Sequence, residues 1–456
     1  MITLIAITGL GVLCLLFEIL NWRKIIIPFT ILGLLGVLGL IYSDFNNVES
    51  YYNNMIVVDK FGMAFSGLFT VLAIFIIALS HDFYAQQQGK LSDFIAIKIF
   101  LLAGSVAMVT FGNLAMFFLG IEILSIALYI LAASDRLNLK SNEAGMKYFL
   151  MGSFASGFIL FGIALVYGAT GSFDVSEIYA LSQSGLIPQW FFIGMILIIV
   201  GMLFKIAAVP FHFWAPDVYE GSPLLTTATM STLAKVVAMA ALYKLVSGLN
   251  ANSSPIFEIV IAVVSVLSMT VGNLMALRQD NVKRMLAFSG VSHAGFMLIA
   301  LLTLSAGSGI LLYYTAAYAL AGIAAFSVVI YVCKNKGNES IANFNGLAKS
   351  HPLLAAVLAG ALLSMGGIPV FSGFFGKFML FTEAINSGYL AVVLFAVVNS
   401  IISIGYYFKV ILAMYTKESV VLTAKVPFAY YAVAVVSILL NLVIGLFPSL
   451  LLDLMV

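Results

Sequence analysis

Several ionisable side chains stand in the middle of long apolar segments. Glu122 lies in GNLAMFFLGIEILSIALYIL, Lys205 in GMLFKIAAVPFHFW and Lys235 in TTATMSTLAKVVAMAALYKL. A charge at the centre of a membrane helix costs about 2.5–3.5 kcal/mol, and such residues usually mark ion pathways or paired sites. Because carboxyl and amine groups bind and release protons, this set predicts proton transfer inside a membrane.

Glu122 is an acidic group at the middle of its segment, about ten residues from each end. A rise of 1.5 Å per residue places it about 15 Å deep. We expect it to take part in proton transfer. The alternative is a structural carboxylate that pairs with a neighbouring helix.

Lys205 stands beside a proline in a stretch, 188–218, that is too long for one straight helix. Proline has no N–H, and the ring of Pro210 displaces the carbonyl four residues back, that of Ile206. A broken helix beside a buried charge exposes backbone dipoles to a polar cavity, an arrangement typical of transporters. The alternative is an ordinary proline kink in which the lysine extends to the membrane surface.

A second overlong stretch, 352–388, resembles the first in having a proline near a lysine, Lys377. It contains SMGGIPVFSGFFGKFMLF, in which Gly367 and Pro369 weaken the helix. By the same steric rule, Pro369 frees the carbonyl of Met365. The sequence therefore predicts two broken helices, each with a lysine near the break.

Two further residues are candidates for a proton relay. His293, in FSGVSHAGFMLIA, is about ten residues into an apolar segment, and its ordinary pKa near 6.5 suits a relay between lysines. A hydrogen-bonded structural histidine is the alternative. Lys147, at the start of another segment, is either a relay on the intake side or an interfacial anchor. Other lysines in apolar segments are expected to reach the membrane interface and are left out of the site: Lys98, Lys244 and Lys409.

The elements that must position these residues are membrane-spanning helices. Of the 456 residues, 63% are hydrophobic and 9% charged, against about 25% charged in soluble domains, and the mean hydropathy is +1.13. Apolar runs of about 20 residues, each able to cross roughly 30 Å of hydrocarbon, recur along the whole chain. We predict an all-α polytopic protein with about fourteen spans: 3–21, 25–43, 62–81, 94–110, 112–133, 145–169, 188–218, 222–248, 256–277, 284–305, 308–332, 352–388, 390–414 and 427–452.

The distribution of lysine and arginine predicts the orientation. These residues gather in alternate connections, whereas 44–59, 170–187, 249–255 and 306–307 contain none. Basic connections face the cytoplasm. With an even number of spans, both termini are expected on the non-cytoplasmic side of a bacterial inner membrane.

The two broken helices predict an internal repeat, since paired interruptions at corresponding places indicate duplicated halves. The units run over 94–248 and 256–414, with N-terminal helices over 1–93 and a C-terminal helix over 415–456. Each unit has five spans, and an odd number gives the two units opposite orientations in the membrane.

Redox and phosphoryl chemistry have no motif in this sequence. It has no P-loop, no cysteine-rich iron–sulfur motif and no haem-attachment motif, and Cys14 and Cys333 are far apart. With no basic domain, a nucleic-acid partner is not expected. We expect no cofactor and no metal in this chain.

One segment carries a family resemblance. FKIAAVPFHFWAPDVYEGSP, with Glu122 upstream and Lys235 downstream, resembles the antiporter-like membrane subunits of respiratory complex I. The same family includes subunits of multisubunit cation/proton antiporters and of membrane-bound hydrogenases. RQDNVKRMLAFSGVSHAGF and GFFGKF are most similar to its subunit N branch, and the resemblance covers nearly the whole chain.

The resemblance implies two inverted half-channels joined by a central polar axis. Glu122 would pair with Lys205, and Lys235 and Lys377 would continue the relay, with Lys377 on the exit side. NADH oxidation and quinone reduction, with FMN and iron–sulfur clusters, would take place on partner subunits of the membrane and peripheral arms. This chain would then be a proton-pumping subunit of an NADH–quinone oxidoreductase, surrounded by lipid.

Two rival interpretations remain open. The first is a subunit of a cation/proton antiporter complex that uses no redox energy. The second is a structural membrane scaffold whose buried charges only pair helices.

Overall fold

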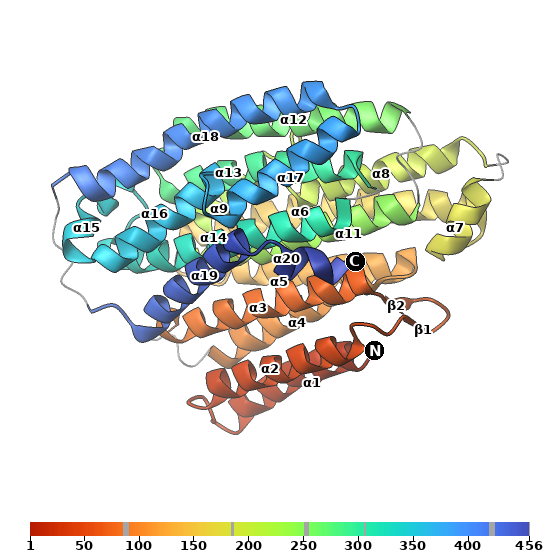
Figure 1. Ribbon diagram of the computed structural model, residues 1–456. Helices are drawn as coiled ribbons and strands as arrows, with labels where there is room; N and C mark the ends of the chain where they lie inside the picture. The colour runs from red at the N-terminus through yellow and green to blue at the C-terminus, as the bar shows by residue number, and fades with distance from the viewer. Residues whose placement is uncertain (85–90, 184–186, 250–254, 305–306, 419–424, 456) are drawn as a thin grey trace.

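The structure consists almost entirely of long, roughly parallel helices (Figure 1). It is a computed structural model that describes residues 1–84, 91–183, 187–249, 255–304, 307–418 and 425–455. Within these residues, twelve helices are long and apolar enough to cross a membrane. They are α1 (Ile2–Ile19), α2 (Ile26–Asp44), α3 (Lys60–Phe83), α4 (Leu91–Thr110), α5 (Leu114–Ala132), α6 (Leu139–Thr170), the continuous helix Leu224–Gly248, α12 (Pro255–Leu277), α13 (Val282–Leu298, extended to Leu302), α14 (Gly307–Lys336), α18 (Leu390–Thr416) and α19 (Phe428–Leu446).

Both overlong stretches are broken, as predicted. The first consists of α8 (Trp190–Lys205) and α9 (Trp214–Gly221), and the second of α16 (Pro352–Gly366) and α17 (Ser372–Asn386). The all-helical polytopic fold is confirmed. The count of fourteen spans and the inverted repeats stay predictions.

The continuous helix Leu224–Gly248 contains an interruption that the sequence analysis did not predict. It is made of α10 (Leu224–Thr229), a π-helical turn (Met230–Ala234) and α11 (Lys235–Gly248). A π-helical turn widens the backbone by one residue and is frequent at functional sites. Here it ends directly before Lys235.

Several helices begin at side chains that cap them. The side chain of Asp59 accepts a hydrogen bond from the N–H of Gly62 at the start of α3. The side chain of Asn113 accepts one from the N–H of Met116 at the start of α5. Asn281 caps α13 in the same way. Such caps satisfy backbone donors that have no partner within the helix, and they fix where each span begins.

One predicted span is shorter than expected. The stretch 427–452 is not one helix, because α19 ends at Leu446 and a short helix, α20 (Ser449–Leu452), follows. Pro448 lies between the two helices, and its missing N–H prevents continuation of the first. The remaining elements are short: β1 (Glu49–Tyr51), β2 (Ile56–Val58), α7 (Val175–Ser182), α15 (Leu347–Ser350) and 3-10 turns at Ile299–Leu302, Ile341–Phe344 and Asp453–Met455.

The bundle has a buried centre and exposed edges. In α13 and α14 every residue of the most apolar stretch is buried, whereas in α1 only 28% is buried. Figure 1 shows α1 and α2 at one edge and α12 and α18 at the opposite edge. These outer helices expose many large apolar side chains and bury others against the bundle, as expected for contact with lipid or with other membrane subunits.

Charged side chains gather at the two ends of the bundle. We call the end that carries Lys140, Lys283, Arg284, Lys334 and Lys409 the basic end. The chain begins at the other end, and α20 lies there too (Figure 1). There Lys244 donates to Asp59 Oδ2 at 2.9 Å and to the carbonyl of Val109 at 2.7 Å.

Candidate functional site

The first break separates α8 from α9 over residues 206–213 and holds Pro210. Two side chains fix it. The indole of Trp214 donates to the carbonyl of Phe204 at 3.0 Å, and the hydroxyl of Ser268 on α12 accepts from the N–H of Val209 at 2.9 Å. A tryptophan and a serine, neither of which titrates near neutral pH, thus bind two backbone groups at the break, and the buried His212 contacts the backbone of Pro210.

Lys205, the last residue of α8, turns away from this break. Its ammonium donates to the hydroxyls of Ser125 on α5 at 2.7 Å and Ser156 on α6 at 3.2 Å, with Tyr129 at 3.5 Å. In the described part of the chain it forms no ion pair with a carboxylate. Lys205 therefore rests on hydroxyl oxygens of two neighbouring helices.

Glu122 lies one helical turn from Ser125 on α5, on the face toward Lys205. One of its carboxylate oxygens, Oε1, is buried and has no hydrogen-bond partner among the described residues. The charges of Glu122 and Lys205 interact, although the two groups do not form the close pair that the resemblance implied. A buried carboxylate oxygen without a hydrogen bond costs free energy, so Oε1 of Glu122 is available to accept a hydrogen bond.

The second break, between α16 and α17, is built differently. Lys377 donates to the carbonyls of Met365 at 3.1 Å and Gly366 at 3.3 Å, and it lies 4.6 Å from the ring centre of Phe296. Gly367 ends α16 with φ of +83°, a conformation that favours glycine. The prediction that Pro369 leaves the Met365 carbonyl free of its helix is confirmed, and Lys377 is its partner.

Lys235 lies between the two breaks and has no hydrogen-bond partner among the described residues. Its side chain is 2% exposed. A Cβ atom at Gly290 of α13 would lie 2.9 Å from its Nζ, and 3.3 Å from the hydroxyl of Tyr318, so both groups border the same small space. Tyr318 in turn donates to the carbonyl of Ser231, within the π-helical turn, at 2.9 Å.

His293 connects the surroundings of Lys235 with those of Lys377. Its Nδ1 lies 2.7 Å from the hydroxyl of Tyr314 and its Nε2 3.1 Å from that of Tyr407. Its ring centre is 4.7 Å from that of Tyr318. His293, Tyr314, Tyr318 and Lys377 line a cavity of about 10 Å³, room for about one water molecule.

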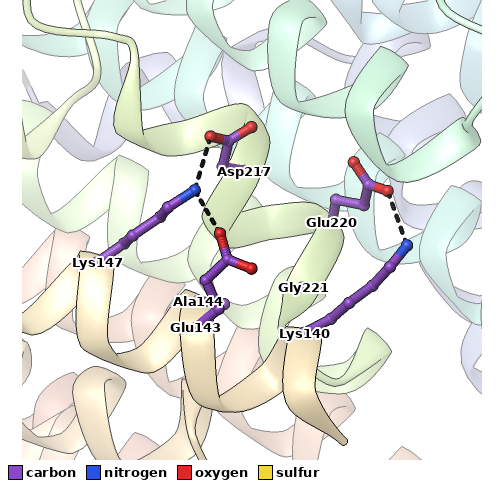
Figure 2. Close-up of a pocket in the computed structure, with 7 residues that line it drawn as sticks. All are labelled: Lys140, Glu143, Ala144, Lys147, Asp217, Glu220 and Gly221. Atoms are coloured by element: carbon purple, nitrogen blue, oxygen red, sulfur yellow. Dashed lines mark hydrogen bonds and ion pairs between the residues drawn. The ribbon is translucent and has the colours of Figure 1, made fainter.

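Lys147 lies outside this buried path, in a cluster of charges at the basic end (Figure 2). It forms ion pairs with Glu143 at 2.7 Å and Asp217 at 3.3 Å. Lys140 pairs with Glu220 in the same recess, whose volume is about 150 Å³. Asp217 and Glu220 belong to α9, so the cluster connects the surface with the chain segment just after the first break.

The three lysines left out of the site differ in their surroundings. Lys409 reaches the basic end, where it pairs with Asp280 at 2.8 Å. Lys244 lies at the other end of the bundle, where it pairs with Asp59. Lys98 is buried, with 3% of its surface exposed, and binds Ser80 near the end of α3; that it reaches a membrane interface stays a prediction.

The tyrosines around His293 are the other residues that sequence reasoning missed. Tyr314 and Tyr318 are four residues apart on α14 and so lie on one helix face. That spacing was a usable signal. Tyr407 comes from α18, and nothing in the sequence places it beside α13.

The fold and the buried lysines define the class of this protein: a helical membrane protein with paired broken helices around ionisable groups, as in ion transporters. The chain belongs to the NADH:quinone oxidoreductase/Mrp antiporter transmembrane family, whose profile matches residues 112–403.

Individual relatives agree with this assignment. The chain is 70% identical to the NADH-quinone oxidoreductase subunit N of Flavobacterium johnsoniae, with 99% of each chain covered. It is similar to a chain in the structure of respiratory complex I from Thermus thermophilus with bound aureothin, with 31% identity, a TM-score of 0.85 and coverage of 99% and 98%. A chain of the Mrp complex from Dietzia has a TM-score of 0.89 at 21% identity, covering 99% and 95%, a likeness of fold alone.

Proposed function

We propose that this chain is a proton-translocating subunit of the membrane arm of an NADH–quinone oxidoreductase. The observation that carries the proposal is the buried row of ionisable groups: Lys235, His293 and Lys377 are linked through tyrosines and a water-sized cavity. A proton can move along such a row by short transfers between neighbours.

Lys205 and Glu122 form the first switch of the relay. Lys205 binds hydroxyls, and an unpartnered carboxylate oxygen lies one turn away on α5. A rotation of the lysine side chain would exchange hydroxyl partners for the carboxylate. An ion pair at 4 Å is worth about 4 kcal/mol at an effective dielectric constant of 20. Moving one proton against 100 mV requires about 2.3 kcal/mol, so making or breaking this pair is large enough to matter.

Lys235 is the central carrier. Its ammonium has no ion pair and no hydrogen bond among the described residues, so it can exchange a proton without breaking either. His293 passes the proton on, and Lys377 receives it at the second break. Lys147 serves the intake side, where its charge cluster borders the first broken helix.

The energy comes from partner subunits. Oxidation of NADH and reduction of a quinone, with FMN and iron–sulfur clusters, take place there, and this chain contributes proton transfer. Its outer apolar helices contact lipid and neighbouring membrane-arm subunits.

The predicted topology fits this role. Residues 94–248 and 256–414 are two inverted repeats, each with one broken helix, and both termini lie on the non-cytoplasmic side of the bacterial inner membrane. The basic end then faces the cytoplasm.

The test is separation of gently solubilised membranes on native gels, with staining for NADH oxidation and mass spectrometry of the band that contains this chain. We expect one very large NADH-oxidising band with flavin and iron–sulfur subunits. Migration with small hydrophobic partners, without NADH oxidation, would contradict the proposal and favour a cation/proton antiporter.

A further inference from the structure

Lys98 is a buried lysine that the relay above does not use. The described part of the chain almost completely buries Lys98, Lys235, Lys283 and Lys377. Lys283 is paired with Glu339 at 3.1 Å. Lys98 has no carboxylate within ion-pair distance among the described residues, and in this it resembles Lys235 and Lys377.

Little in its surroundings explains Lys98 as a structural residue. Its ammonium has three donors, and one of them binds the hydroxyl of Ser80 at 2.8 Å. Ser80 already donates to the carbonyl of Ile76 at 2.8 Å, so it does not need the lysine. An apolar side chain would fill this place between α3 and α4 without the cost of a buried charge.

Tyr84 connects Lys98 with a polar recess at the basic end. The Lys98 ammonium lies 4.8 Å from the ring centre of Tyr84, whose hydroxyl is buried without a hydrogen-bond partner among the described residues. Tyr84 also lines a recess of about 260 Å³, enough for several waters at about 30 Å³ each. The charged residues of its lining are Asp135, Lys140, Glu220, Lys283, Lys334 and Glu339.

The recess continues toward the charge cluster of Lys147. Lys140, Glu220 and Gly221 line both spaces. Lys98 stands seven residues after the start of α4, about 10 Å along the helix. It therefore lies between the recess and the middle of the membrane.

We propose that Lys98 is a second proton-loading residue on the intake side, filled from this recess past the ring of Tyr84. The step moves one proton from water in the recess to the Nζ atom, converting an amine to an ammonium, and no electron is transferred. The inference rests on the proposed function, because it adds an intake residue to the same proton path.

The test uses the assembled complex in inverted membrane vesicles, with proton pumping measured by a pH-gradient dye and divided by the rate of NADH oxidation. Lys98→Met should lower this ratio about tenfold. This effect is smaller than the loss of about 10²–10⁴ expected for a single essential proton-transfer group, because Lys147 offers a parallel intake. Lys98→Arg should be equally low, since a guanidinium does not release its proton. The thermal stability of both assembled variants should match that of the parent.

Two outcomes would overturn the inference: a normal ratio in assembled Lys98→Met, or restoration by Lys98→Arg, which would show a structural cation. If Lys98→Met does not assemble, Lys98→Gln keeps a polar contact with Ser80 and is judged by the same outcomes. Lys235→Met separates the two proposals, and Lys409→Met is the surface control. If Lys235→Met still pumps, the proposed function is contradicted. If Lys235→Met does not pump but the Lys98 variants pump normally, only the inference about Lys98 is contradicted.

Discussion

The two helix breaks have the same sequence signature and different chemistry. At the second break, Lys377 binds carbonyls that its own broken helix releases. At the first break, the indole of Trp214 and the hydroxyl of Ser268 bind the backbone, and Lys205 turns to hydroxyls on α5 and α6. A lysine held by backbone carbonyls is fixed in place. A lysine held by serines, with an unpartnered carboxylate one turn away, can change partners.

This difference separates two duties within one relay. The first break is suited to switching, because Lys205 has two alternative sets of acceptors. The second is suited to holding a proton, because the two carbonyls bind the Lys377 ammonium more strongly than they would bind a neutral amine. Variants at the two lysines should therefore differ in stability even where they agree in function.

The largest combined effect is expected for Lys377→Met. Proton pumping should fall about a hundredfold, at the lower end of what a positioned proton-transfer group contributes. The carbonyls of Met365 and Gly366 lose their donor, which should reduce stability by about 1–3 kcal/mol. Pumping in vesicles and thermal unfolding of the purified complex measure the two effects, with Lys409→Met as the control. An assembled variant as stable as the parent would show that Lys377 does not hold the break.

Lys205→Met should reduce pumping to a similar extent with little change in stability. Ser125 and Ser156 can redirect their hydroxyls to carbonyls of their own helices, so no buried group is left without a partner. The same two measurements apply, and the complex should assemble in normal amounts. Normal pumping in an assembled variant would remove Lys205 from the relay, and a loss of stability equal to that of Lys377→Met would erase the contrast between the breaks.

Glu122→Gln should have a smaller effect, a loss of pumping of about tenfold, because the amide neither attracts the Lys205 ammonium strongly nor carries a proton. The hydroxyl contacts of Lys205 remain. Glu49→Gln, at an exposed position of β1 outside these charge clusters, is the matched control. If both variants pump equally well, Glu122 is a structural carboxylate and the partner exchange at the first break does not occur.

Lys147→Met should have the smallest effect, a decrease of about twofold, since exposed ion pairs contribute about 0.2–1 kcal/mol. Its ion pairs with Glu143 and Asp217 lie at the surface and should weaken with salt. Pumping by Lys147→Met, measured at low and high ionic strength and compared with pumping by Lys140→Met, checks the size of this decrease. A loss as large as that of Lys205→Met would place Lys147 inside the essential relay.

Proline and length together were sufficient to predict both broken helices and the lysines beside them. Pro210 and Pro369 act through a local steric rule, which needs no knowledge of neighbouring helices. The freed carbonyl of Met365 followed from the same rule.

Partners contributed by distant helices could not be predicted. Lys98 and Lys409 look alike in sequence, and the packing of other helices around α4, with Ser80 of α3 as the partner of Lys98, buries the first. The preference of Lys205 for Ser125 over Glu122 depends on the rotation of α5 relative to α8. The π-helical turn before Lys235 has no compositional signal, since its residues suit an α-helix.

The most direct test of the proton relay is the pumping activity of Lys235→Met in the assembled complex. Lys235 has no partner among the described residues, so methionine should pack in its place without loss of assembly or thermal stability. NADH-driven proton uptake into inverted vesicles should fall about a hundredfold. An assembled Lys235→Met complex that pumps at the parental rate would contradict a relay through the centre of this protein.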